Sequence, residues 1–150
     1  MNTSASTRLR DYLGLKFVSV NEESICMQLL LNHRHLNQAG TLHGGVVTTM
    51  IDIACSIAVR ACQDESPTGS AEPEPDADRP VATLTLNTCF LATTRRGVVT
   101  VHAQRRGGGK RIHFAAAQVK DQNGKLLATG EGSYTLKPRA RQADSHSPVA

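Results

Sequence analysis

Apolar residues alternate with polar ones in several segments of this chain and fill one long segment almost without interruption. In Ser24–Leu31 they occupy every second position, which predicts a β-strand with one buried face. Phe17–Asn21 predicts a preceding strand, joined to it by a polar turn at Asn21–Glu23. Thr7–Leu15 predicts a short helix before both strands, and Asn32–Gly45, rich in His, Asn and Gly, predicts a loop after them.

The uninterrupted apolar segment is Val46–Cys62, which contains no Gly or Pro. It predicts a long helix that is buried on most faces. Asp121–Gly124 predicts a hairpin turn, and Arg105–Lys110 predicts a Gly-rich basic turn. Around these turns lie four strand-like runs, Val81–Leu91, Val98–Arg105, Arg111–Lys120 and Leu126–Leu136.

This order of elements predicts an α+β fold in which a curled antiparallel sheet wraps around one long central helix. A single helix cannot cover both faces of so long a sheet, so the sheet must curl to bury its apolar face. Long edge strands remain, and such edges often pair with another subunit. The exposed edges therefore predict pairing with another subunit.

The length and composition indicate one domain over residues 1–150, with 39% hydrophobic residues to form a core. Residues 1–6, 64–80 and 138–150 are polar and small and are expected to be disordered. Within the insert Gln63–Pro80, prolines and acids dominate. The first ten residues have no apolar segment typical of a signal peptide, and no run of about 18 apolar residues is found. We therefore expect a cytoplasmic protein that does not enter a membrane.

Charge is unevenly distributed. The net charge is +4, but Gln63–Pro80 holds six of the thirteen acids, which leaves 16 bases against 7 acids elsewhere. This excess favours an anionic partner such as a phosphorylated ligand, although general solubility explains it equally well. Nucleic acid is disfavoured, because bound bases stack on aromatic side chains and the chain has three Phe, two Tyr and no Trp.

The cysteines and histidines do not form a pattern typical of metal sites. Cys26, Cys55, Cys62 and Cys89 contain no C-x-x-C pair and are expected to be reduced and buried. His33-x-His35 has no third ligand at a recognisable spacing, so we expect no metal. His35 is expected to pack or form hydrogen bonds within its loop.

Asp52 is the residue that most needs an explanation, because it lies in the middle of the predicted apolar helix. A buried carboxylate is costly without a partner, and no cation lies three or four residues away. The spacing of four places Thr48, Asp52 and Ser56 on one face as a narrow polar stripe. Such a stripe is typical either of a small active site or of an acid held by hydroxyls and backbone amides.

His43-Gly44-Gly45 immediately precedes the predicted helix. The first N–H groups of a helix have no intrahelical partner and carry partial positive charge. Glycines allow a ligand oxygen to approach these groups, as an oxyanion site requires. The combination with an acid nine residues after the histidine favours an active site.

The segment from His35 to Gly45, followed by Asp52, resembles the H-x-N-x-x-G-x-x-H-G-G-x(6)-D signature of PaaI-like hotdog-fold acyl-CoA thioesterases. Asp121-x-x-Gly124 and the residues up to Gly130 resemble the last hairpin of that family. The resemblance covers roughly Leu13–Leu136, with the acidic insert as its clear departure. It implies a hotdog fold and hydrolysis of acyl- or aryl-CoA thioesters without a cofactor. It also implies a homodimer or a homotetramer with sites at the dimer interface.

The resemblance also implies roles for individual residues. Asp52 matches the family carboxylate, which acts as a general base or as a nucleophile. Gly44 matches the glycine whose N–H polarises the thioester carbonyl. His43 and Asn37 match residues that shape the site, whereas Ser56 and Thr83 match hydroxyl positions that vary within the family.

The basic turn at residues 105–111 is the candidate for binding the phosphates of coenzyme A. Arg and Lys form charge-assisted hydrogen bonds, and Gly amides approach phosphate oxygens closely. An ordinary solvated turn is the alternative. The candidate substrate-binding residues are Gly45, Arg106, Gly108, Lys110 and Arg111.

Two other functions fit the same fold. A hotdog hydratase or dehydratase would use a catalytic His together with a carboxylate, but here His43 directly precedes the Gly-Gly pair. A non-catalytic acyl-CoA-binding or regulatory protein would not need Asp52. No G-x-S-x-G motif is present, which disfavours an α/β-hydrolase.

Overall fold

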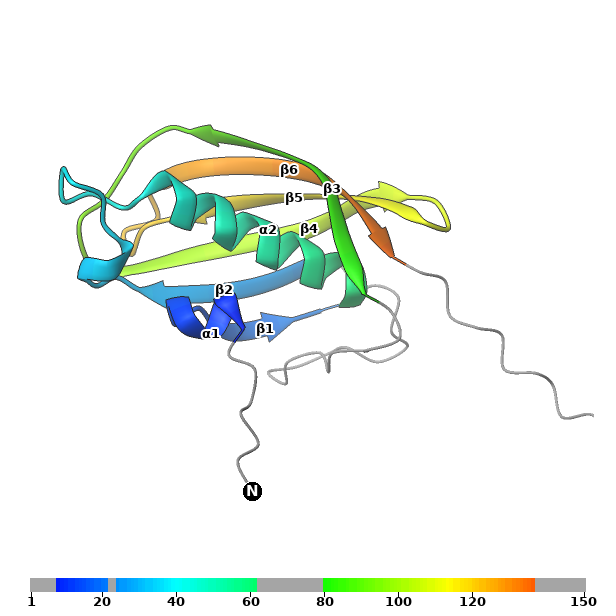
Figure 1. Cartoon of the computed structure of the whole chain (residues 1–150), viewed down its shortest axis with the longest axis horizontal. Coiled ribbons are helices and arrows are strands. Elements are labelled where there is room, and N and C mark those ends of the chain that lie inside the picture. Colours follow the sequence, from blue (N-terminus) through cyan, green and yellow to red (C-terminus); the bar gives the residue numbers. More distant parts are fainter. Residues whose placement is uncertain (1–7, 22–23, 62–79, 137–150) are drawn as a thin grey trace, which may run out of the picture.

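The computed structural model describes residues 8–21, 24–61 and 80–136. Except for Pro80, the segments expected to be disordered lie outside these residues. Figure 1 shows the elements α1 (Leu9–Leu13), β1 (Lys16–Val20), β2 (Ser24–Leu30), η1 (His33–His35), α2 (Gly44–Ala61), β3 (Val81–Phe90), β4 (Val98–Gly108), β5 (Ile112–Lys120) and β6 (Leu126–Leu136).

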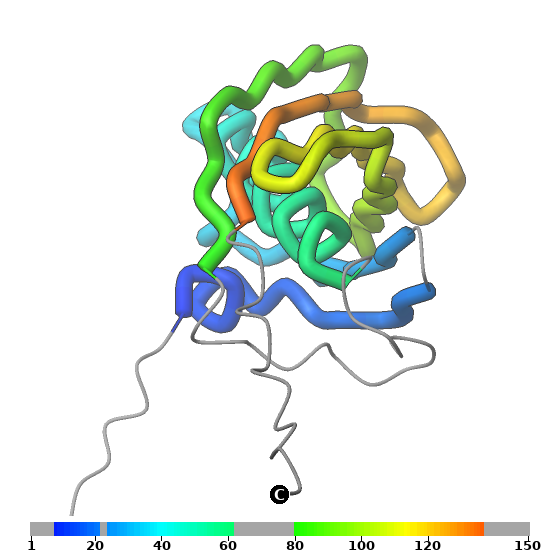
Figure 2. Tube along the Cα trace, turned by 90° about the vertical axis from the view of Figure 1, so that its right-hand side faces the viewer, coloured from blue at the N-terminus to red at the C-terminus, as the bar shows by residue number. Residues whose placement is uncertain are grey.

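The six strands form one antiparallel sheet in the order β1-β2-β4-β5-β6-β3. The sheet curls around α2, which packs against β2 to β6 (Figures 1 and 2). The core lies between α2 and the concave face of the sheet, where residues such as Met50, Ile51, Val101 and Val119 are fully buried. This arrangement confirms the predicted α+β class and the hotdog fold implied by the resemblance.

Gly130 on β6 allows α2 to lie close to the sheet. A Cβ atom on Gly130 would lie 2.8 Å from Ile51 Cγ2, so only glycine allows this approach. α2 has 18 residues, and by length and composition alone it is long and apolar enough to cross a membrane. The sequence analysis did not anticipate this property. Half of its residues are buried in this domain, as in the core helix of a globular fold.

Several predicted elements begin or end at other residues than the observed ones. α2 begins at Gly44 and not at Val46, because glycine is tolerated where the first helical N–H groups have no partner. α1 is shorter than predicted and ends at Leu13, because the next residue, Gly14, has a φ of +80° and forms a left-handed cap. β4 extends through most of the predicted basic turn to Gly108, because a bulge between Arg105 and Gly107 preserves its pairing with β5.

The prediction that all cysteines are buried is wrong for two of them. Cys55 is buried in α2, but Cys26 is partly buried and Cys89 is exposed, because both occupy the solvent side of their strands. Cys26 Sγ lies 3.1 Å from Nε2 of His102 on the neighbouring strand. All three are free thiols, and Cys62 lies outside the described residues.

Candidate active site

Asp52 lies midway along α2 and faces a cavity of about 360 Å³. A cavity of this volume is within the range of small-ligand sites. The polar stripe predicted for the helix forms one wall of the cavity, and α1 and β3 form the others. The residues that line it are Arg8, Leu9, Arg10, Thr48, Thr49, Asp52, Ile53, Ser56, Ile57, Arg60 and Leu86.

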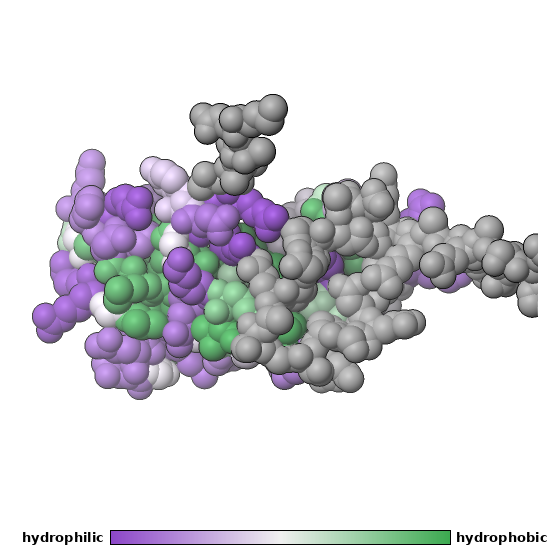
Figure 3. Space-filling model, turned by 90° about the horizontal axis from the view of Figure 1, so that it is seen from below, coloured by the Kyte–Doolittle hydropathy of each residue, from purple (hydrophilic) through white to green (hydrophobic). Residues whose placement is uncertain are grey.

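The cavity lies next to α1, the helix nearest the underside of the molecule in Figure 1. Figure 3 shows this underside as a mixture of hydrophilic and apolar side chains. Leu9 is one of the exposed large hydrophobic residues and also lines the cavity. The cavity therefore combines an acid, arginines and aliphatic side chains, which suits a ligand with both polar and apolar parts.

The Asp52 carboxylate is held by a hydroxyl from the sheet. Thr83 Oγ1 donates a hydrogen bond of 2.7 Å to Asp52 Oδ1. A bulge in β3 between Thr83 and Thr85 makes this contact possible. Leu86 also lines the cavity, and strict alternation would place residues 83 and 86 on opposite faces. The extra residue in the bulge returns Thr83 to the helix side.

Ser56, one turn after Asp52, also lines the cavity. Its Oγ donates to the backbone oxygen of Ile53 at 2.9 Å. A hydroxyl has one hydrogen to donate and two lone pairs to accept with. Ser56 can therefore accept a hydrogen bond from water beside Asp52, while its own hydrogen is directed to the helix backbone.

Gly44 is the first residue of α2, and no hydrogen bond from its N–H to another described residue is present. The ring of Phe90 lies against this glycine, and a Cβ atom on Gly44 would lie 3.3 Å from its Cε1. An N–H with no partner among the described residues can serve as an oxyanion donor, and the Phe90 ring limits the space beside it.

His43 is fixed by the backbone that follows it. Gly45 N–H donates to His43 Nδ1 at 2.8 Å, so in the neutral ring the hydrogen is on Nε2. The Gly45 N–H is therefore already hydrogen-bonded to His43. The imidazole of His43 is exposed, so its Nε2–H is accessible to solvent.

Asn37 shapes the loop before the helix. Its Oδ1 accepts hydrogen bonds from the backbone N–H groups of Ala39 and Thr41, at 3.0 and 3.1 Å, and from Thr41 Oγ1 at 3.2 Å. Buried His35 accepts from Asn32 N–H through Nδ1 and contacts the Leu13 oxygen at 2.7 Å through Nε2. Its expected role within the loop is confirmed.

Gly44 and Asp52 are eight residues apart on one straight helix. At 1.5 Å per residue, about 12 Å of helix axis separates them. A polarised carbonyl and the water that attacks it must both lie within about 3 Å of their respective protein groups. One ligand atom therefore cannot contact both the Gly44 N–H and the Asp52 carboxylate of the same chain.

Comparison with known proteins agrees with this fold. A thioesterase from Haemophilus influenzae has a similar structure, with a TM-score of 0.75 and 22% identity, covering 92% of this chain and 89% of that one. The sequence profile of the thioesterase superfamily matches residues 39–128. The chain belongs to the thioesterase superfamily.

Two relatives in this superfamily carry specific names. Acyl-coenzyme A thioesterase 13 from Mus musculus is 26% identical over 123 residues, covering 79% of this chain and 77% of the relative. The 1,4-dihydroxy-2-naphthoyl-CoA hydrolase of Listeria monocytogenes is 27% identical over 133 residues, covering 89% of this chain and 98% of the relative.

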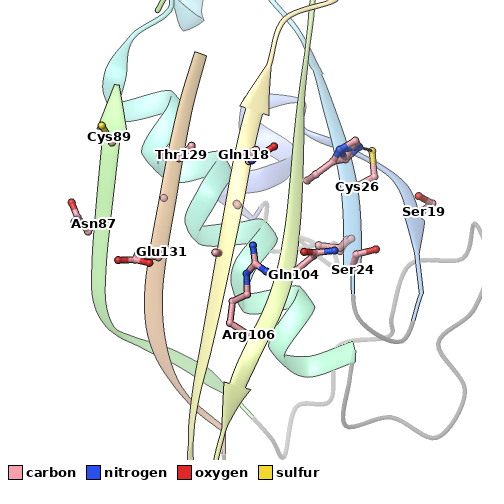
Figure 4. A pocket seen from close by; sticks show the side chains of 15 residues that line it. Ser19, Ser24, Cys26, Asn87, Cys89, Gln104, Arg106, Gln118, Thr129 and Glu131 are labelled. Atoms are coloured by element: carbon pink, nitrogen blue, oxygen red, sulfur yellow. Dashed lines mark hydrogen bonds between the residues drawn. The ribbon is translucent and has the colours of Figure 1, made fainter. Parts of the chain in front are cut away.

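The structure does not bring the basic residues to Asp52. Arg106 lines a separate groove of about 750 Å³ on the outer face of the sheet. Figure 4 shows Arg106, Gln104, Gln118 and Glu131 on this face, with the helix behind the sheet. Gly108 lies against His113, and Lys110 and Arg111 are exposed at the end of the β4–β5 hairpin.

Other residues near Asp52 were missed by the sequence analysis. Arg60 lies eight residues after Asp52, so extending the spacing of four by one more turn would have placed it on the same face. Arg8, Arg10 and Leu86 reach the cavity from other elements, and no sequence spacing relates them to Asp52.

Proposed function

We propose that this protein hydrolyses acyl- or aryl-CoA thioesters to a free acid and coenzyme A. The observation that carries the proposal is the Asp52 carboxylate, held by Thr83 at the wall of a cavity in a thioesterase fold. The names of the two relatives support coenzyme A thioesters as the substrate class.

The residues suit the chemistry of a thioester. As a general base, Asp52 takes a proton from water while the oxygen of that water attacks the carbonyl carbon. Alternatively, Asp52 attacks the carbon itself and water then hydrolyses the acyl-enzyme intermediate. The Gly44 N–H stabilises the charge that develops on the carbonyl oxygen. The C–S bond breaks, and the thiolate leaves readily without a metal or a redox cofactor.

The direct test is release of thiol from short-chain, medium-chain, long-chain and aryl-CoA esters. Turnover of any of these esters supports the proposal, and the ranking of kcat/KM identifies the preferred acyl group. If no ester is hydrolysed while coenzyme A still binds, the protein is instead a binding protein of the same fold.

The active site is proposed to form between two copies of the chain, with Gly44 from one and Asp52 from the other. The 12 Å of helix axis between these residues supports this arrangement. β3 is an edge strand and is mostly exposed. The large apolar residues Leu84, Phe90 and Leu91, in or directly after β3, are more than half exposed, so a second copy would bury them.

Mixing two inactive variants tests this arrangement. We expect Asp52→Asn and Gly44→Pro, each inactive alone, to regain activity after subunit exchange, because each heterodimer contains one intact site. Random exchange would restore about a quarter of wild-type activity. Thiol release after mixing measures it, with each variant exchanged against itself as the control. If mixing restores no activity although heterodimers form, both residues act within one chain.

Arg106, Gly108, Lys110 and Arg111 are proposed to contact the phosphates of coenzyme A from the β4–β5 hairpin, and Gly45 to contact the substrate near the helix start. We expect Lys110→Ala or Arg106→Ala to raise KM by about two- to fivefold with little change in kcat, because an exposed ion pair is worth ~1 kcal/mol or less. Lys125→Ala, on the turn at the opposite end of β5, is the matched control. An unchanged KM in both test variants excludes the assignment.

A further inference from the structure

Tyr134 of β6 lies directly opposite Thr83 in the sheet, and its side chain is fully buried. Residues opposite each other in an antiparallel pair extend their side chains on the same face. Thr83 faces α2, because its hydroxyl bonds to Asp52. Tyr134 therefore points toward α2 at the level of Asp52, but from within the core.

A glycine makes room for the phenol. A Cβ atom on Gly132 would lie 2.9 Å from the Tyr134 hydroxyl oxygen and 2.6 Å from the Thr85 backbone oxygen. The phenol therefore extends back along β6 over Gly132. Two residues earlier, Gly130 makes room for Ile51 of α2, the residue before Asp52.

The Tyr134 hydroxyl is buried and forms no hydrogen bond of standard geometry with any described residue. Burial raises the pKa of Tyr134, and the nearby Cys55 and Asp52 raise it further by charge and hydrogen bonding. Burial likewise raises the pKa of the Cys55 thiol to about 12. Both groups are therefore protonated at neutral pH, and the phenol is available as a donor. A buried donor that remains unpaired destabilises the fold.

We infer that Tyr134 is a positioning residue for Asp52. Its O–H donates to the carboxylate from inside the fold, while Thr83 holds the carboxylate from the rim of the cavity. The two hydroxyls limit rotation of the carboxylate and keep it directed at the cavity. The catalytic consequence rests on the proposed function, but the contact itself does not.

Other titratable groups also surround Asp52, and the test must separate them from Tyr134. Cys55 and Arg60 belong to the same helix, His113 lies opposite Tyr134 on β5, and Arg8 and Arg10 line the cavity from the α1 side. Comparing the wild-type protein with Asp52→Asn isolates the effect of the Asp52 carboxylate on Tyr134.

The first experiment is NMR of the protein labelled with 13C at Tyr Cζ. The chain has two tyrosines, so two signals are expected, and the exposed Tyr12 is the internal control. We expect the Tyr134 signal to shift as Asp52 is protonated and to lose this response in Asp52→Asn, while the Tyr12 signal does not change. This readout requires neither activity nor a Tyr134 variant that folds. An identical response in wild type and Asp52→Asn overturns the inference.

The second experiment is Tyr134→Phe, which removes only the hydroxyl. We expect kcat to fall about tenfold with KM within about twofold, because a hydrogen bond to a charged group is lost. The acidic limb of the kcat profile moves to higher pH, since the charged form of the base loses a donor. Tyr12→Phe is expected to leave both properties unchanged. A folded Tyr134→Phe protein with unchanged kcat and pH profile assigns Tyr134 to packing alone.

Discussion

The Asp52→Asn protein is expected to lose thioester hydrolysis by about 10²- to 10⁴-fold in kcat, the usual contribution of a general base. Asparagine has the same shape, and its oxygen can still accept the hydrogen bond from Thr83, so the fold is retained. An amide, however, neither takes a proton from water nor attacks a thioester. Thiol release from the best CoA ester measures kcat, and binding of coenzyme A checks that the rest of the site is intact.

Asp11→Asn is the matched control for this variant. Asp11 is an exposed acid of α1, the helix beside the same cavity, and it pairs with Arg10 at 3.2 Å. The control removes the same charge without altering α2, and we expect its kcat to remain within about twofold of wild type, because exposed ion pairs contribute little. An Asp52→Asn protein that retains most of its kcat removes Asp52 from the mechanism.

The Gly44→Pro protein is expected to lose about 10²- to 10³-fold in kcat, the usual cost of removing one oxyanion donor. Proline lacks the N–H but is well tolerated at the first position of a helix, where that N–H has no intrahelical partner. His43 precedes the helix and is not itself helical, which suits a residue before proline. The substitution therefore removes the proposed donor with little disturbance of α2.

Gly44→Ala separates the donor from the space around it. Alanine keeps the N–H but places a Cβ atom 3.3 Å from the Phe90 ring. That ring is 55% exposed and can move by a few tenths of an ångström, so we expect a small loss of activity. A deficit confined to Gly44→Pro identifies the N–H as the donor. Equal deficits in both variants would assign the effect to steric contact with Phe90.

Much of the fold was predictable because it depends on local patterns. Alternation in Ser24–Leu31 predicted β2, and the apolar run after Gly45 predicted α2 within two residues of its observed start. The solvent exposure of Cys89 was missed, because a small apolar residue is compatible with either face of a strand. The basic turn was predicted too long, because pairing across a bulge keeps Arg106 and the next two glycines in β4.

The sequence alone determined that an acid would lie within an apolar helix, one face of which carries Thr48 and Ser56. Helical periodicity is a property of neighbouring residues and can be read without the fold. The family resemblance pointed to Thr83 as a site hydroxyl, but only the tertiary structure showed its hydrogen bond to that acid. Only the tertiary structure brought Tyr134 near the acid and placed Arg106 in a different groove. Their positions depend on a bulge in β3, on strand register, and on Gly130 and Gly132 of β6, which make room for α2 and for the Tyr134 ring respectively. These features arise from pairing between distant segments, which no local spacing encodes.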